Sequence, residues 1–424
     1  YVASEQTAAP DVTAETAPME VAYVEEVLPP SLFPGLKKRL EDAPPLLRDS
    51  RFYLRPRTYH FDRQRDGADD SLATAYGGWL AFASGDWRER VRAEARLFTT
   101  QRAHGPRDKD GTLLLAEGQE GFWVLGEANV EVDLTDSVST TLYRQSLNLP
   151  YLNRSDSRMV PNTFEAYTLR KRPDDRWAFL VSHVRQMKLR NSDDFVSMAQ
   201  AAGFEDEDEP LTVGSARIDL APGVNVGAVY QHAWEFMGTF YAEGNAVVRP
   251  TEELELKFGA QYTKQDSVGD EIGGDFDTHV YGGKLAASWR NAILTFAFTR
   301  TDDTRIRNPF GGYPGYLSLM IQSFNRAEED GWLVGLSYDF GRLGLPGLSG
   351  FVNYAEGDTP DNGGFASPDQ EELDITVDYR FQSRALSGLW IRARAATLDQ
   401  DDDVPGAVDV DDFRVILNYE WPIL

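Results

Sequence analysis

Two stretches of the chain concentrate arginine beside residues that can oppose or orient its charge. The first stretch, 147–162, holds four such residues within five positions: Arg154, Asp156, Ser157 and Arg158. The second stretch, 302–329, holds another four: Arg305, Arg307, Asn308 and Arg326. A guanidinium binds a carboxylate through two parallel hydrogen bonds, and an opposing Asp keeps such a site from holding the anion too tightly. Both properties are what a narrow, charged ring in an aqueous pore needs.

Further arginines alternate with apolar residues in segments that read as strands, and they would form a basic path along a wall: Arg88, Arg90, Arg92, Arg96, Arg392, Arg394 and Arg414. Both arginine groups also have a simpler interpretation. Asp156 could pair with its neighbours only to fix the loop, and three acidic residues could neutralise the wall: Glu94, Glu127 and Glu131.

No arrangement of residues indicates catalysis, so we expect no enzyme and no cofactor. The chain has no cysteine, and its five histidines are scattered without metal-ligand spacing. Ser182 and His183 are adjacent in an expected strand and therefore point to opposite faces. Acidic clusters occur at 193–194, 205–209 and 399–412. They could hold a divalent cation, alone or bridging lipopolysaccharide phosphates, or form a solvated rim.

The chain from Arg51 onward consists of strand-like segments. We count eighteen, the first at 51–62, the third at 87–99 and the last at 412–421, and most have about 9–13 residues, the length a tilted membrane strand needs. Tight turns alternate with long loops, and only the connection near Glu235 breaks this rhythm. The long loops are 63–71, 100–120, 147–162, 189–210, 265–276, 302–329, 356–370 and 399–411.

Composition fits a membrane barrel better than a soluble sandwich. The formal charge of −26 argues against a nucleic-acid partner. Mean hydropathy is −0.43, and no apolar run approaches the ~18 residues of a spanning helix. Because charged and apolar residues alternate along the strands, we expect the charged face to line water and the apolar face to meet lipid. The prediction is an all-β fold, an 18-stranded antiparallel transmembrane barrel with inward-folded constriction loops.

The first part of the chain differs from this barrel. Residues 1–48 are acidic and rich in Ala and Pro, with a short helix expected within 31–42. They form a separate extension, either flexible in the periplasm or plugging the barrel of residues 49–424. The start of the chain lacks the basic and apolar regions of a signal peptide.

Several motifs, met in order along residues 50–424, resemble the OprD-type outer-membrane porins. They are Tyr76-Gly77-Gly78-Trp79-Leu80, Leu149-Pro150-Tyr151-Leu152-Asn153-Arg154-Ser155-Asp156-Ser157-Arg158, Pro161-Asn162-Thr163-Phe164, Tyr281-Gly282-Gly283-Lys284-Leu285, Asn308-Pro309-Phe310-Gly311-Gly312-Tyr313-Pro314-Gly315-Tyr316, Phe324-Asn325-Arg326-Ala327 and Leu343-Gly344-Leu345-Pro346-Gly347-Leu348. The resemblance implies an eighteen-stranded barrel, monomeric or loosely trimeric. It also implies diffusion of small nutrients, often carboxylates, across a Gram-negative outer membrane.

The sequence therefore predicts a passive outer-membrane porin, selective for small hydrophilic solutes that bear a carboxylate, with membrane lipid and lipopolysaccharide as surroundings. Two alternatives stay open. The negative charge favours a cation-tolerant or neutral-solute pore, and an extension that plugs the barrel would favour an adhesion or scaffold protein.

Overall fold

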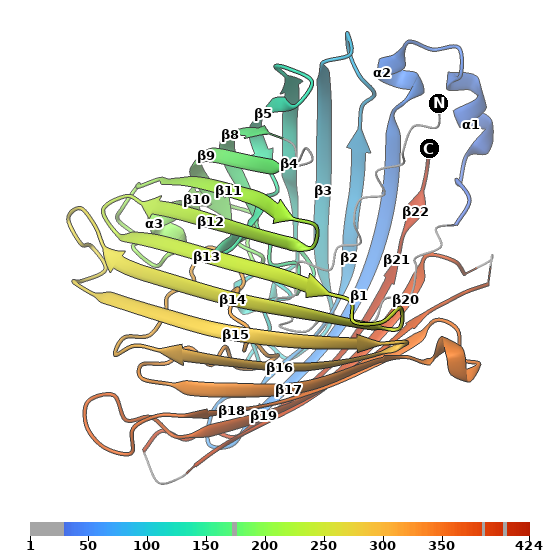
Figure 1. Ribbon diagram of the computed structural model, residues 1–424. Helices are drawn as coiled ribbons and strands as arrows, with labels where there is room; N and C mark the ends of the chain where they lie inside the picture. The colour runs from blue at the N-terminus through green and yellow to red at the C-terminus, as the bar shows by residue number, and fades with distance from the viewer. Residues whose placement is uncertain (1–28, 172–175, 384–385, 402–404) are drawn as a thin grey trace.

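The computed structural model describes residues 29–171, 176–383, 386–401 and 405–424. In this part of the chain, eighteen antiparallel strands form a closed barrel (Figure 1). They are β1 (Arg51–Arg65), β2 (Ser71–Ala83), β3 (Val91–His104), β4 (Phe122–Asp133), β5 (Val138–Gln145), β8 (Thr163–Lys171), β9 (Trp177–Lys188), β11 (Leu211–Ala221), β12 (Val224–Ala233), β13 (Met237–Val248), β14 (Leu254–Ser267), β15 (Asp277–Trp289), β16 (Ala292–Thr301), β17 (Asp330–Asp339), β18 (Leu348–Asp358), β19 (Gln370–Arg380), β20 (Leu389–Gln400) and β21 (Val410–Tyr419).

The remaining elements are short. Two small strands extend the barrel sheet, β10 (Phe195–Ser197) beside β9 and β22 (Trp421–Pro422) beside β1, while β6 (Asn148–Leu149) and β7 (Leu152–Asn153) pair with each other. The helices are α1 (Pro34–Leu40), α2 (Pro45–Arg48) and α3 (Met198–Ala201), with single 3-10 turns at Glu117–Gln119 and Phe340–Leu343. Among the described residues, no helix is both long enough and apolar enough to cross a bilayer.

Closure of the barrel joins the first strand to the last. Arg57 in β1 lies opposite Asn418 in β21, and the pairing continues to Arg65 opposite Val410. Every other strand pairs with its neighbours in chain order, so the sheet has no free edge at membrane depth. This satisfies the requirement that backbone polar groups in lipid find partners within the protein.

The two faces of each strand separate as expected from the sequence. In β19, Ile375 and Val377 are 46% and 45% exposed, whereas Asp374 and Asp378 on the other face are 1% and 5% exposed. Because the chain is a closed barrel, the exposed apolar face is the lipid face and the charged face looks inward.

The connections at the two ends of the barrel also differ as predicted. Short turns such as 222–223 and 290–291 lie at one end, while the long connections 105–121, 146–162, 189–210 and 302–329 lie at the other. The short link 234–236 between β12 and β13 is the expected exception. The prediction that the third strand begins at 87 is wrong: residues 87–90 form a turn, in which Arg88 and Glu89 have positive φ, and β3 begins at Val91.

Three long connections fold into the barrel and pack against its wall. Loop 146–162 and loop 302–329 share an apolar core, in which Tyr151 and Tyr313 lie with Val213 and Val280 of the wall. Loop 105–121, which the sequence did not single out, packs Leu114 against Phe61 and Phe98 of β1 and β3. A cavity remains beside β18 to β21, and a larger one lies beside β8 to β13.

The lipid-facing assignment predicts the effect of a charge near the middle of β19. Ile375→Arg should lower the free energy of unfolding from lipid vesicles by roughly 2–4 kcal/mol, the cost of Arg near the bilayer midplane. Denaturant titration of the reconstituted protein measures this, with Ile375→Leu as the apolar control. Equal stability of the two variants would contradict the assignment.

Candidate functional site

Besides their shared apolar core, the two inward loops are joined by hydrogen bonds of one asparagine. The side-chain amide of Asn153 donates to the Gly312 carbonyl at 3.0 Å, and its Oδ1 accepts from the Gly312 amide at 2.8 Å. The Asn153 amide also donates to the carbonyl of Phe310 at 3.2 Å. A Cβ on Gly311 would lie 2.7 Å from the Asn153 side chain, so this close approach requires glycine there. The loops therefore form one body across the lumen.

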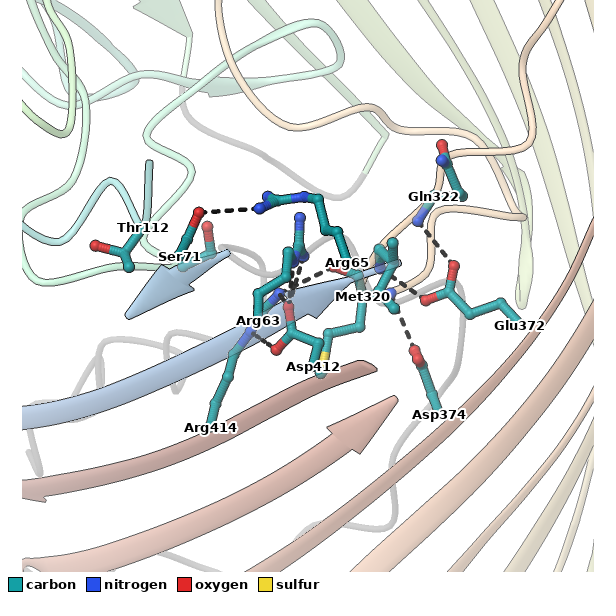
Figure 2. Close-up of polar contacts among 12 residues, drawn as sticks. Arg63, Arg65, Ser71, Thr112, Met320, Gln322, Glu372, Asp374, Asp412 and Arg414 are labelled. Atoms are coloured by element: carbon teal, nitrogen blue, oxygen red, sulfur yellow. Dashed lines mark hydrogen bonds and ion pairs between the residues drawn. The ribbon is translucent and has the colours of Figure 1, made fainter. Parts of the chain in front are cut away.

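The tip of loop 302–329 is attached to the wall by charged side chains on both sides, as Figure 2 shows. The amides of Ile321 and Gln322 donate to the two oxygens of Glu372 at 2.7 and 2.8 Å, and the Met320 amide donates to Asp374 at 3.0 Å. The Met320 carbonyl accepts from Arg414 at 3.1 Å. Three backbone amides of the tip thus face carboxylates of β19.

Loop 146–162 is held by a buried ion pair to β1. Arg57 and Asp156 lie 2.7 Å apart, and Arg154 lies 3.5 Å from the same carboxylate. Arg57 also donates to the Asn418 side chain and to the Arg158 carbonyl. Burial by itself raises the pKa of Asp156, but the cations Arg57 and Arg154 outweigh it and hold that pKa below its usual value. Asp156 is therefore ionised near neutral pH.

A cavity of about 200 Å³ remains between these loops and the wall. Four arginines line it from separate elements: Arg158, Arg190, Arg394 and Arg414. Hydroxyl, amide and carboxylate side chains line the rest, together with the loop tip: Ser155, Ser157, Asn308, Ser318, Ser323, Asn353 and Asp374. The cavity thus combines a cluster of cations with a surface rich in oxygen atoms.

Two of the four arginines are not neutralised. Arg158 donates to the carbonyls of Thr112 and Ser157 at 2.9 and 2.8 Å, and Arg190 donates to the Ser157 hydroxyl at 2.7 Å. In the described part of the chain, neither lies within ion-pair distance of a carboxylate. Burial, followed by repulsion from Arg414, lowers the pKa of both, and that of Arg158 falls well below its ordinary value. Each cation would be stabilised by an anion in the cavity.

The other two arginines are held by partners on the wall. Arg414 makes two hydrogen bonds to Asp412, at 2.7 and 2.9 Å, and Arg63 binds the same carboxylate (Figure 2). Arg394 donates to the Thr376 hydroxyl at 3.1 Å. The guanidinium carbons of Arg158 and Arg414 lie 5.0 and 4.7 Å from the centre of the Phe61 ring, which fixes their spacing.

The constriction and path residues proposed from sequence fall into three groups. Five of them line the cavity: Ser157, Arg158, Asn308, Arg394 and Arg414. Arg154 and Asp156 lie behind it in the ion-pair cluster with Arg57. The other arginines of loop 302–329 are elsewhere: Arg307 covers the Phe276 ring, Arg326 pairs with Glu329, and Arg305 is exposed.

The predicted basic path is partly neutralised. Arg92 contacts Asp133 and Glu131, Arg96 contacts Glu127, and Arg392 binds Asp378. The placement of Arg88 and Arg90 on the same strand face is wrong, because both lie in the turn before β3.

Sequence reasoning missed Arg190 and the loop tip 318–323. Arg190 follows β9 in a loop whose neighbouring Asp193 and Asp194 suggested an acidic rim, and its approach to Ser157 spans 33 residues. The tip carries no charge of its own, and only its backbone contacts with β19 reveal its role. Among the described residues, no three carboxylate or histidine side chains gather as a metal-binding group.

The whole barrel sequence matches a known family, described as outer membrane porin, OprD family, over residues 46–423. The chain belongs to the OprD family. It is thus a channel of the Gram-negative outer membrane that passes small molecules. No curated protein matches the chain.

Solved structures of OprD-family channels share the fold. OccK9 (OpdG) of Pseudomonas aeruginosa superposes with a TM-score of 0.79 at 22% identity, covering 89% of this chain and 100% of its own. OpdK of Pseudomonas aeruginosa, solved with vanillate, gives 0.79 at 20% identity, with 88% and 99% covered. OccAB4 of Acinetobacter baumannii gives 0.77 at 15% identity, with 88% and 98% covered.

The attachment of the loop tip predicts that Glu372 controls the width of the channel. Glu372→Gln replaces one carboxylate oxygen with an NH₂ group that faces a backbone N–H. The lost hydrogen bond should weaken the attachment of the loop tip by roughly 1–3 kcal/mol, the cost of an unpaired buried polar group. The released tip should raise single-channel conductance and open-channel noise in planar bilayers. Glu371→Gln is the matched control, because Glu371 lies on the outer face and binds the Tyr354 hydroxyl. Identical conductance and noise in both variants would contradict this role.

Proposed function

We propose that this porin gives passive diffusion to small carboxylate-bearing solutes, which it selects through Arg158 and Arg190. The observation that carries the proposal is the pair of partly buried guanidinium groups that line the cavity and, within the described part of the chain, bind neutral oxygens without a carboxylate partner. An arriving carboxylate would relieve the repulsion among Arg158, Arg190 and Arg414, and it can accept from a guanidinium fork.

The same arrangement keeps binding weak enough for release. Arg158 already donates to the carbonyls of Thr112 and Ser157, and Arg190 donates to the Ser157 hydroxyl. Part of their hydrogen-bonding capacity is therefore used before a solute arrives. Asp374 also lines the cavity and repels an anion. A solute would gain a modest attraction and leave readily, which conduction requires.

The loop tip favours solutes that carry a donor besides the carboxylate. The amides of Met320, Ile321 and Gln322 are occupied by Asp374 and Glu372. The side chains of Ser318 and Ser323 line the cavity beside these amides. The structural relative OpdK was solved with vanillate, a carboxylate, which is consistent with the proposed class of solute.

Two alternatives from the sequence predict different electrical behaviour. A cation-tolerant pore, favoured by the net charge of −26, would give a reversal potential of opposite sign in a salt gradient. A plugged scaffold would give no conductance steps at all.

Of the extension, residues 29–48 are described, and they contact the C-terminal segment and the β2–β3 turn. Residues 1–28 lie outside the described part of the chain.

Removal of either unneutralised cation should reduce anion preference. Arg158→Gln and Arg190→Gln should each lower the anion-to-cation permeability ratio several-fold, because each removes a partly buried positive charge from the cavity surface. Reversal potentials in a salt gradient across planar bilayers measure the ratio. Arg305→Gln removes an equal charge from an exposed loop position and should change the ratio little. An unchanged reversal potential in both cavity variants would refute the assigned role.

Solute chemistry can be tested with molecules that differ only in charge. In liposome-swelling assays, a small carboxylate should enter faster than the amide of the same acid. Added salt should reduce the difference only modestly, because buried charges are weakly screened. Equal rates for the acid anion and its amide would exclude recognition of the carboxylate, while conductance in the same preparation would still establish an open pore.

A further inference from the structure

The segment before the barrel, residues 29–50, carries an apolar surface that no described residue covers. α1 and α2 contain no buried residue. Five large apolar side chains in this segment are at least one-third exposed: Leu32, Phe33, Leu36, Leu46 and Leu47. Single exposed apolar residues are ordinary, but a group of five in sixteen positions is unusual for a segment facing water.

The segment is nevertheless attached to the barrel at two places. The Leu32 amide donates to the Pro422 carbonyl at 3.0 Å, and the Gly85 amide donates to the Leu46 carbonyl at 2.9 Å. Pro29 packs so closely against Gly388 that a Cβ added to Gly388 would lie 2.7 Å from the proline ring. Figure 1 shows α1 and α2 near the C terminus, at the end of the barrel that carries the short turns. That end is the periplasmic end of such a barrel.

Both attachment points lie beside the outer, lipid-facing aromatic residues of the barrel. Near the Gly85 contact, Trp87 is half exposed, and Phe52 packs edge-on against Phe82 on the outer face of β1 and β2. Near the Pro422 contact, the Tyr419 and Trp421 rings pack at a tilt of 39° with their centres 4.0 Å apart. Aromatic side chains in such positions mark the membrane–water boundary. The apolar surface of the segment thus continues the lipid-facing surface of the barrel.

Charge in the segment is arranged as in helices that lie on a membrane. At 3.6 residues per turn, Phe33, Leu36 and Leu40 share one face of α1. Lys37 and Arg39 flank that face, and Lys38 lies opposite it. These consecutive cations stand out in a chain with a net charge of −26. Basic residues beside an apolar face favour an anionic lipid surface.

We propose that residues 32–47 dock on the periplasmic leaflet of the outer membrane, with Phe33, Leu36, Leu40, Leu46 and Leu47 among the lipid chains. Lys37 and Arg39 would reach anionic lipid headgroups. The segment would then lie at the membrane surface on one side of the barrel. Because it is attached to both β22 and the β2–β3 turn, its binding to lipid would hold the region where the barrel closes.

The proposal can be tested in full-length protein because the chain has no cysteine. Leu36→Cys and Lys38→Cys, each labelled with an environment-sensitive fluorophore, report the apolar face and the opposite face of one helix. The protein is reconstituted into phosphatidylethanolamine vesicles with and without phosphatidylglycerol. Lipid-borne nitroxide and aqueous iodide serve as quenchers.

We expect the Leu36 label to be blue-shifted, quenched by nitroxide lipid and protected from iodide, and the Lys38 label to show the reverse. Equal iodide access at both positions would overturn the docking. Replacing Lys37, Lys38 and Arg39 with Gln should remove the effect of phosphatidylglycerol on the Leu36 label. An unchanged dependence on phosphatidylglycerol in that variant would overturn the assignment of the headgroup contact to these cations. Channel conductance, measured in parallel, confirms that each variant is folded.

Discussion

Backbone polar groups at membrane depth must find partners inside the protein, and this constraint shapes both the wall and the lumen. The wall meets it by closing β1 onto β21. Irregular loops inside the lumen meet it by a different route, because wall side chains supply the missing partners. Gln265 both donates to the Arg307 carbonyl and accepts from the Arg307 amide, and Gln231 donates to the Pro150 carbonyl. Glu372 plays the same part for the loop tip.

Because wall side chains are used to bind the loops, most charged side chains of the lumen do not act on a solute. Carboxylates of the wall accept loop amides or hold arginines, as Asp412 holds Arg63 and Arg414. Arg57 is occupied by Asp156 and Asn418. The cations that remain for a solute are those whose partners are neutral oxygens, and their loops place them at the cavity. Structure and selectivity therefore depend on the same hydrogen-bond network but on different members of it.

Local patterns in the sequence predicted the barrel, because side-chain alternation and turn chemistry are local. They failed at 87–90, where Arg88 and Glu89 adopt left-handed backbone conformations although neither residue is a glycine. The site was predicted less completely, since its contacts are not local. Asp156 was expected to act in the pore with Arg154 and Arg158, but its main partner is Arg57, ninety-nine residues earlier. The hydrogen bond of Arg190 to Ser157 likewise depends on a fold that only the assembled barrel specifies.

The contrast between a net charge of −26 and a basic cavity follows from where the charges lie. Many carboxylates lie at the end of the barrel that carries the long loops, where Asp399, Asp409 and Asp411 line one surface pocket with Arg65. Exposed charges there are screened within about 8 Å at physiological ionic strength. Arg158 and Arg190 are partly buried and face a cavity of about 200 Å³, where screening is weaker. The field that a solute meets at its closest approach is therefore set mainly by these few cations, and the net charge of the sequence carries little information about selectivity.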